Sequence, residues 1–247
     1  MKEYFKTSRG YNLAYHYTAP EDSNLATVVF LGGFMSDMEG SKATGFESLC
    51  AARGQGYLRF DYSGHGQSDQ DFTDGTIGQW AEDAFDIISS VTKGPLVLVG
   101  SSMGGWISLL IAPRLANRVK GFIGIAAAPD FIKDMLNSSI SDDQLKELDE
   151  KGIFCMPSDY DAPYPITKQL VEDGKIQCIL DQPIDLNIPV RLLQGTEDTA
   201  VADEKPELIK QALTTQDIEI EWFEGGNHSL SRPEDIERID KHIQSLS

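Results

Sequence analysis

The chain has 247 residues, of which 40% are hydrophobic and 24% are charged, an ordinary composition for a folded globular protein. Its formal net charge is −18, from 39 acidic and 21 basic residues, and this charge repels phosphate backbones, so we expect no nucleic-acid partner. Its apolar runs fall short of the ~20 residues that a membrane-spanning helix needs, so we expect no membrane span either.

Short apolar runs alternate with helical patterns along the chain. The N-terminal segment MKEYFKTSRGYNLAYHY alternates polar and aromatic residues like an opening strand. Residues 26–34 and 56–69 each join an apolar run to a glycine-rich turn, and residues 41–53 between them have a helical pattern. Further strands are predicted at residues 96–99, 121–128, 188–195 and 217–225. Strands that alternate with helices predict an α/β protein, with a mostly parallel sheet covered by helices on both faces.

The alternation breaks once, over approximately residues 129–187. This segment carries two amphipathic helical patterns and the proline-rich stretch MPSDYDAPYP, with no obvious core strand. Long insertions without a sheet of their own are usually functional or disordered. We therefore expect a small helical lid inserted into a single domain that spans residues 1–247, the alternative being a plain surface excursion.

Cysteine usage and the N-terminal residues indicate the compartment. Cys50, Cys155 and Cys178 are odd in number and lack the paired C-x-x-C spacing of zinc or redox sites, which is typical of free thiols in a reducing compartment. The N-terminal residues show neither the apolar stretch of a secretory signal nor an Arg-rich transit segment. We therefore expect a cytoplasmic location.

A G-x-S-x-G motif follows the predicted strand at residues 96–99. Gly100, Ser102 and Gly104 stand at a strand-to-helix boundary, the context in which this motif forms a sharp turn. The turn lifts the serine oxygen above the sheet edge, and only small residues fit two positions before and after it. Ser101 competes for the role, but only Ser102 has glycine at both positions. Ser102 is therefore the predicted nucleophile.

A serine hydroxyl needs a general base, and the chain has four histidines. His16 lies in a predicted strand and His242 in a predicted terminal helix, while His65 belongs to the glycine-rich DYSGHGQSD turn and is interpreted as structural. His228 follows the last predicted strand, at the sheet edge where sites on parallel sheets gather. It is the predicted base.

The base in turn needs a carboxylate that holds its tautomer. Asp198, preferred to Glu197, lies in the GTEDTAV loop directly after the strand at residues 188–195. The order Ser102, Asp198, His228 is the order of nucleophile, acid and base in the α/β-hydrolase fold.

Two backbone N–H groups should face the oxyanion of a tetrahedral intermediate. One belongs to Met103, the residue after the nucleophile, and the second to Phe34, in the glycine-rich turn after the strand at residues 26–34. The alternative for this turn is a tight connection with no catalytic part.

Segments along nearly the whole chain resemble the abhydrolase-domain-containing protein 10 family: LGGFMSDMEGSKA, RFDYSGHGQSD, LVGSSMGGW, GIFCMPSDY, IPVRLLQGTEDTAV and the His228 loop. The resemblance implies the α/β-hydrolase fold, and acyl-protein thioesterase or acyl-glucuronide esterase activity. It places the family's triad on Ser102, Asp198 and His228. The family's animal members are described as mitochondrial, whereas this sequence shows no transit segment, so we expect a bacterial relative.

These features predict a serine hydrolase that cleaves carboxylic esters or thioesters through an acyl-enzyme on Ser102, with a small molecule or an acylated protein as substrate. A cofactor-free perhydrolase and a non-catalytic ligand-binding protein on the same fold are the alternatives. No metal and no cofactor are expected, because neither a metal-ligand cluster nor a dinucleotide fingerprint is evident. If the lid covers the site, Ile153, Phe154 and Met156 are predicted to line an acyl pocket.

Overall fold

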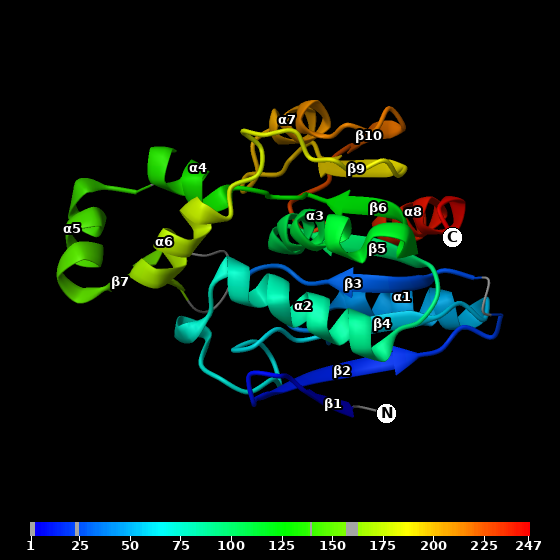
Figure 1. The fold of residues 1–247 in the computed structure, drawn as a ribbon. Helices are drawn as coiled ribbons and strands as arrows, with labels where there is room; N and C mark the ends of the chain where they lie inside the picture. Colours follow the sequence, from blue (N-terminus) through cyan, green and yellow to red (C-terminus); the bar gives the residue numbers. More distant parts are fainter. Residues whose placement is uncertain (1–2, 23–24, 139, 157–162) are drawn as a thin grey trace.

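An eight-stranded sheet forms the centre of the structure, with strand order β1-β2-β4-β3-β5-β6-β9-β10 (Figure 1). The computed structural model describes residues 3–22, 25–138, 140–156 and 163–247. β2 runs antiparallel to both β1 and β4, and the other neighbouring strands are parallel. The strands are β1 (Glu3–Lys6), β2 (Asn12–Thr18), β3 (Thr27–Leu31), β4 (Tyr57–Phe60), β5 (Leu96–Ser101), β6 (Val119–Ile125), β9 (Val190–Gly195) and β10 (Ile218–Phe223).

The central strands are apolar because both of their faces are covered. Every residue of β3, β4 and β5 is buried, as parallel strands between two helix layers require. β10 lies at the sheet edge, and Phe223 is its one buried residue. The mostly parallel sheet confirms the fold class predicted from the sequence.

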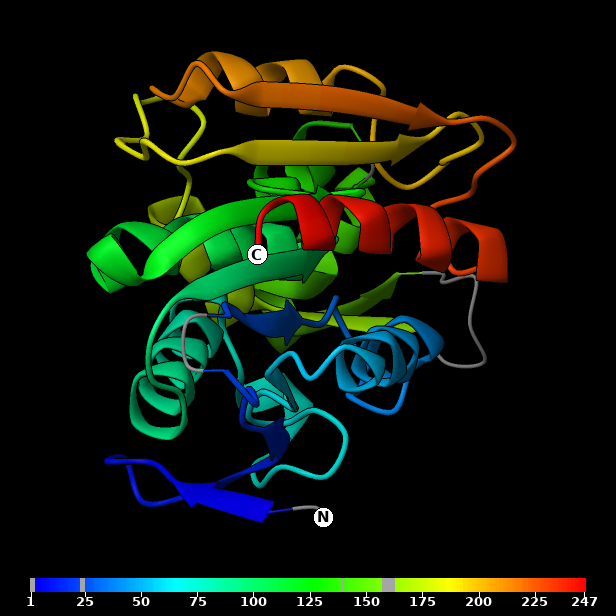
Figure 2. The same ribbon diagram turned by 90° about the vertical axis from the view of Figure 1, so that its right-hand side faces the viewer.

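Helices cover both faces of the sheet (Figure 2). On one face, α1 and α8 pack together and contribute Phe46 and Ile239 to the smaller of two core clusters. On the other face, α2 and α3 contribute Trp80 and Trp106 to the larger cluster, and α7 packs against β9 and β10. These helices are α1 (Ser41–Ala52), α2 (Ile77–Val91), α3 (Met103–Leu115), α7 (Lys205–Ala212) and α8 (Pro233–Ser245), with short 3-10 turns η1 (Phe72–Asp74) and η2 (Ala116–Arg118).

The N-terminal segment forms two strands where its pattern suggested one. A turn joins β1 to β2, in which Thr7 N–H donates to Tyr11 O over 2.9 Å. Gly10 has φ +98°, a left-handed conformation that glycine adopts without strain. The chain therefore folds back on itself, and β1 becomes the antiparallel edge of the sheet.

The insertion predicted at residues 129–187 contains helices and also a small sheet of its own. Its helices are α4 (Phe131–Ser138), α5 (Asp142–Lys151) and α6 (Lys168–Ile176). Between α5 and α6, β7 (Ile153–Met156) pairs antiparallel with β8 (Tyr164–Thr167). The expectation of an insertion without strands was wrong here, because strands of four residues, one containing Pro165, leave little periodicity to read. Most of the MPSDYDAPYP stretch lies outside the described residues.

Hydrogen bonds join the two ends of the insertion to each other and join its return to α3. The buried Asp130 carboxylate accepts from the N–H groups of Ile179 (2.9 Å) and Leu180 (3.0 Å), which ties the start of the insertion to its return. Trp106 Nε1 on α3 donates to Gln177 O over 3.1 Å. The helices α4 and α6 are therefore anchored by these bonds, while α5 lies farther from the sheet (Figure 1).

Candidate active site

Ser102 occupies the sharp turn between β5 and α3. Its φ is +51°, in the left-handed region that non-glycine residues rarely adopt, and its N–H donates to Ile125 O over 2.9 Å. The glycines on either side are steric requirements. A Cβ on Gly100 would lie 2.4 Å from Gly104 O, and one on Gly104 would lie 2.0 Å from Leu31 O. The G-x-S-x-G pattern therefore follows from how closely α3 packs on β3 and β5.

The three residues that the sequence grouped lie in one hydrogen-bonded series. His228 Nε2 is 3.1 Å from Ser102 Oγ, and His228 Nδ1 is 2.9 Å from Asp198 Oδ2. Ser102 follows β5, Asp198 follows β9 and His228 follows β10, so the carboxyl ends of three parallel strands bring the residues together. The geometry suits proton transfer from the serine hydroxyl to an imidazole whose orientation the carboxylate holds.

The Asp198 carboxylate is fully buried and receives four hydrogen bonds. Oδ1 accepts from the N–H groups of Ala200 (2.8 Å) and Val201 (3.0 Å), and Oδ2 accepts from His228 and from Gln194 Nε2 (2.7 Å). Burial acts to raise the pKa of the Asp198 carboxyl, but the hydrogen bond and charge of His228 and the two N–H groups outweigh it, so the pKa lies below its usual value. Asp198 is therefore ionised at neutral pH.

Gln194, which donates to the Asp198 carboxylate, is a residue of the site that the sequence analysis did not identify. It lies near the end of β9 with 1% of its surface exposed, in a strand whose neighbouring residues are apolar. Its one distinguishing signal is a neutral polar side chain at a position where buried strands carry apolar ones.

The two predicted oxyanion donors lie on either side of the nucleophile. Met103 is the first residue of α3, and Phe34 lies in the turn after β3. Gly33 brings this turn close, because a Cβ there would lie 3.4 Å from Ser102 Cβ. Across the described ranges, neither N–H donates to a protein acceptor. Both N–H groups are therefore available to a substrate oxygen.

The ring of Phe34 packs edge-on between the sheet layer and the insertion. Its centroid lies 4.9 Å from that of Phe72, 5.9 Å from Trp80, 5.6 Å from Phe131 and 5.4 Å from Tyr164. Such contacts stabilise by about 0.5–1.5 kcal/mol each beyond the area that they bury. The turn that carries the proposed oxyanion donor is thus held partly by the insertion.

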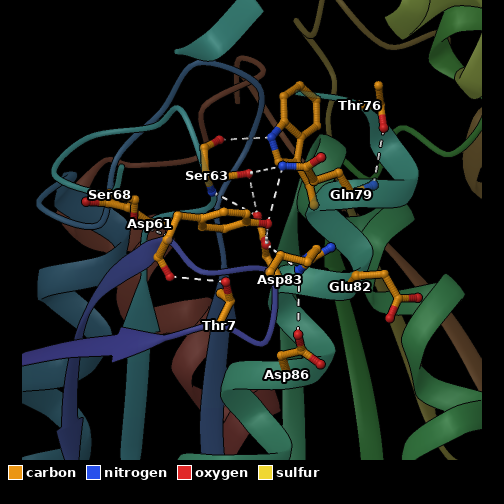
Figure 3. Close-up of polar contacts among 12 residues, drawn as sticks. Thr7, Asp61, Ser63, Ser68, Thr76, Gln79, Glu82, Asp83 and Asp86 are labelled. Atoms are coloured by element: carbon orange, nitrogen blue, oxygen red, sulfur yellow. Dashed lines mark hydrogen bonds and ion pairs between the residues drawn. The ribbon is translucent and has the colours of Figure 1, made fainter. Parts of the chain in front are cut away.

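Behind this turn lies a buried polar network centred on Asp83. Its Oδ2 accepts from the N–H (2.9 Å) and hydroxyl (2.6 Å) of Ser63, which points at the carboxylate in Figure 3. Its Oδ1 accepts from the Tyr11 hydroxyl (2.6 Å) and the Arg9 guanidinium (2.7 Å). The network fixes the DYSGHGQSD turn against α2.

Asp61 joins the same turn to the loop that follows Phe34. Its carboxylate is buried and accepts from the N–H groups of Met38 (2.7 Å) and Gln67 (2.8 Å). Burial raises the pKa of the Asp61 carboxyl to about 6, against the opposing effect of these two N–H groups.

The other histidines lie away from the nucleophile's hydrogen bonds. His65 is packed between the rings of Tyr62, Phe72 and Trp80, and its Nδ1 is 3.2 Å from Ser63 O. Burial lowers the pKa of His65 to about 4, so the ring is neutral near pH 7. His16 pairs with Arg59 in the sheet register, and His242 on α8 contacts Glu221.

The predicted pocket residues lie on β7, where their burial differs. Phe154 is 2% exposed and belongs to the core cluster, Met156 is half-buried and packs against that cluster, and Ile153 is half-buried. Their role in acyl binding stays a prediction. Within the described ranges, Cys50, Cys155 and Cys178 are free thiols, and no group of His, Cys, Asp and Glu could hold a metal ion.

Comparison with known proteins agrees with this architecture. Residues 28–239 match the model of the alpha/beta hydrolase family. The chain belongs to this family. It is 33% identical over 226 residues to the mitochondrial palmitoyl-protein thioesterase ABHD10 of Homo sapiens, which covers 89% of this chain and 74% of the relative. The resemblance seen in the sequence is thereby confirmed, and the chain is an α/β hydrolase related to ABHD10.

Two solved structures of the family are similar over the full chain. A putative hydrolase from Agrobacterium vitis S4 has a TM-score of 0.94 and 36% identity, covering 100% of this chain and 98% of its own. Mouse alpha/beta hydrolase domain-containing protein 10 has a TM-score of 0.90 and 31% identity, with 100% of both chains covered. The described helices of this α/β hydrolase include none long and apolar enough to cross a membrane. The cytoplasmic location stays a prediction, and the curated relatives are named as mitochondrial.

Proposed function

We propose that the chain is a serine hydrolase that cleaves carboxylic esters and thioesters through an acyl-enzyme on Ser102. The observation that carries the proposal is the hydrogen-bonded series Ser102 Oγ, His228 Nε2, His228 Nδ1 and Asp198 Oδ2, with distances of 3.1 and 2.9 Å. A buried, ionised carboxylate, an imidazole and a serine at the start of a helix are the components of nucleophilic acyl transfer.

Acylation begins when Ser102 Oγ attacks the substrate carbonyl. His228 Nε2 accepts the hydroxyl proton, and Asp198 stabilises the imidazolium that forms. The carbonyl oxygen becomes an oxyanion and accepts hydrogen bonds from the N–H groups of Phe34 and Met103, beside the positive end of α3. Collapse of the intermediate breaks the bond to the leaving thiol or alcohol, which takes the proton from His228.

Deacylation repeats these steps with water as the nucleophile. His228 Nε2 accepts a proton from water as its oxygen attacks the acyl carbonyl, and the same two N–H groups face the second oxyanion. Collapse returns the proton to Ser102 Oγ and releases the carboxylic acid. The chain therefore needs no group beyond its own residues and water for either half-reaction.

The relatives favour acyl thioesters as the substrate class. Proteins named as palmitoyl-protein thioesterases are 33% identical to this chain over 226 residues, and the structure of mouse alpha/beta hydrolase domain-containing protein 10 covers 100% of the chain. An acylated protein, or a small molecule such as an acyl-glucuronide, would be the substrate. A non-catalytic binding role is disfavoured by the intact series of nucleophile, base and acid, and a perhydrolase differs only in using peroxide in place of water.

Covalent labelling tests the proposal most directly. A fluorophosphonate probe should modify Ser102, with the adduct located by mass spectrometry of peptides. Ser102→Ala should lose labelling and lower kcat by roughly 10⁴ to 10⁶, whereas Ser101→Ala, which alters the buried neighbouring serine, should retain most activity. Turnover of acetyl and palmitoyl esters and thioesters then shows which bond and which chain length the enzyme prefers. The same assays with hydrogen peroxide test the perhydrolase alternative. Equal residual rates in the two folded variants would remove Ser102 from the role.

A further inference from the structure

We propose that Gln194 is a positioning residue of this site. Its side-chain amide orients the Asp198 carboxylate and weakens the attraction between that carboxylate and the protonated His228 ring. The inference rests on the proposed function. Gln194 is placed at the site by a hydrogen bond of 2.7 Å from Nε2 to Asp198 Oδ2, the same oxygen that His228 Nδ1 contacts at 2.9 Å.

The fold fixes both members of this contact. Gln194 lies opposite Trp222 in the register of β9 with β10, and it shares a face of β9 with the core residue Leu192. Asp198 follows four residues later, after a turn pinned to the end of β10 by the Glu197 N–H, which donates to Gly226 O over 2.8 Å. The turn therefore returns the carboxylate over the end of its own strand, within reach of the Gln194 amide.

A polar side chain at this position is unfavourable unless it is paired, because burial removes its hydration. The bond to Asp198 pairs the amide nitrogen. Since a carboxylate oxygen that accepts a second hydrogen bond carries less charge toward the first donor, Gln194 weakens the attraction between Asp198 and a protonated His228 ring. His228 then releases its proton more readily to a leaving group, while the carboxylate stays fixed from two sides.

Other charged groups near the His228 loop lie on α1, α8 and the Asp198 loop. Lys42 on α1 donates from Nζ to Ser229 O, and Arg232 and Asp235 pair at the start of α8. Glu197 precedes Asp198 in its loop. These groups remain in place when Gln194 is changed, so a shift in the titration of His228 would report the Gln194 amide.

Gln194→Met tests the proposal, because it nearly preserves shape and removes the donor. The ascending limb of the pH profile of kcat/KM should move upward by roughly half a pH unit, which lowers kcat/KM below the limb by about threefold at most. Gln216→Met is the matched control, since this glutamine is exposed and its Nε2 donates to Thr214 O at 3.4 Å, away from Asp198. A merely structural role would lower activity without raising the limb.

NMR of the His228 ring separates this inference from the proposed function, because it needs no turnover. The ring signals, assigned with His228→Ala, should titrate at higher pH in Gln194→Met than in the unaltered chain. In the unaltered chain, the chemical shifts of the Gln194 side-chain amide should change with pH at the same midpoint as those of the His228 ring. This measurement does not depend on the folding of any variant. An unchanged or lower midpoint, or amide signals insensitive to His228, would overturn the proposal, whereas failed fluorophosphonate labelling would overturn only the catalytic assignment.

Discussion

The ring of Phe34 lies edge-on against the ring of Tyr164, with centroids 5.4 Å apart and planes at 79°. Phe34 belongs to the turn that carries the proposed oxyanion donor, and Tyr164 begins strand β8 of the insertion. The contact therefore joins the insertion to the backbone that would face a developing negative charge.

Removal of the Tyr164 ring should lower kcat even for substrates too short to reach the insertion. Tyr164→Ala withdraws one of the four rings around Phe34, so the Phe34 N–H loses part of its fixed position. We expect kcat for an acetyl ester to fall roughly tenfold, less than the loss on removing a whole oxyanion donor, with KM little changed. Steady-state kinetics measures both.

Two controls accompany this substitution. Tyr164→Phe keeps the ring and should stay close to the unaltered rate, and Leu145→Ala changes an exposed residue of α5 on the same insertion. An equal loss in Tyr164→Phe would trace the effect to the hydroxyl and contradict the proposed role of the ring contact.

Ser102 and His228 should show strongly non-additive kinetic effects. Because each needs the other for proton transfer, Ser102→Ala alone and His228→Ala alone should each lower kcat by roughly 10⁴ to 10⁶, and the double variant should be scarcely worse. His65→Ala should leave this chemistry in place, since its ring lies in the aromatic cluster. Additive losses in the double variant would indicate that another residue serves as the base.

Gly104 should tolerate no side chain, because α3 packs directly on β3 at this point. A Cβ there would lie 2.0 Å from the Leu31 carbonyl, and backbone atoms cannot move aside as a side chain can. Gly104→Ala should therefore lower the free energy of unfolding by about 3 kcal/mol or more. Gly40→Ala, whose nearest neighbour is Asp37 O at 3.5 Å, should cost only about 1 kcal/mol or less, the cost of alanine at the N-cap of α1. Urea denaturation followed by circular dichroism compares the two variants.

Sequence patterns locate the sheet and the series Ser102, Asp198, His228 because their causes are local. A strand buried on both faces needs an apolar run, and a turn such as that of Ser102 needs glycines at fixed spacing. Gln194 has no such pattern: its role depends on a turn that folds Asp198 back over β9, and a single glutamine at a strand end is not a motif.

The rings that surround Phe34 and the small sheet of the insertion could not be predicted from local sequence patterns either. The rings around Phe34 come from η1, α2, α4 and β8, segments far apart in the chain whose meeting depends on the whole fold. β7 and β8 are four residues each, too short for a periodicity that distinguishes strand from loop. Tertiary packing, more than local preference, decides both.

Stability should fall as pH rises through the titration range of Asp61. Burial raises its folded-state pKa from 3.8 to about 6, so the folded protein holds a proton that the unfolded chain has already released. The free energy of unfolding should therefore decrease between pH 4 and pH 6 by up to about 3 kcal/mol from this group. Asp61→Asn removes this titrating group, so the free energy of unfolding should depend less steeply on pH between pH 4 and pH 6. A change in stability that is the same at every pH does not affect this comparison. Parallel slopes for the two proteins in thermal unfolding across this range would contradict the assignment.

Met156 should influence the length of acyl chain that the site prefers. It is half-buried on β7 and packs against the core cluster, whereas the neighbouring Cys155 is exposed. If this face lines an acyl pocket, a long chain gains on the order of 0.8 kcal/mol per buried CH₂, and a polar side chain here forfeits part of that gain. Met156→Gln should lower kcat/KM roughly tenfold for palmitoyl thioesters and little for acetyl esters.

The substitution must leave the chemical machinery intact, so fluorophosphonate labelling of Ser102 in Met156→Gln should proceed at nearly the unaltered rate. Cys155→Ser provides a matched control on the exposed position of the same strand, and it should change no substrate selectively. Phe154 is unsuitable for this test, because it is 2% exposed in the core and its replacement would destabilise the fold. If kcat/KM of Met156→Gln fell by one common factor across a series of acyl chain lengths, β7 would be a packing surface only, and chain-length preference would have to reside elsewhere around Ser102.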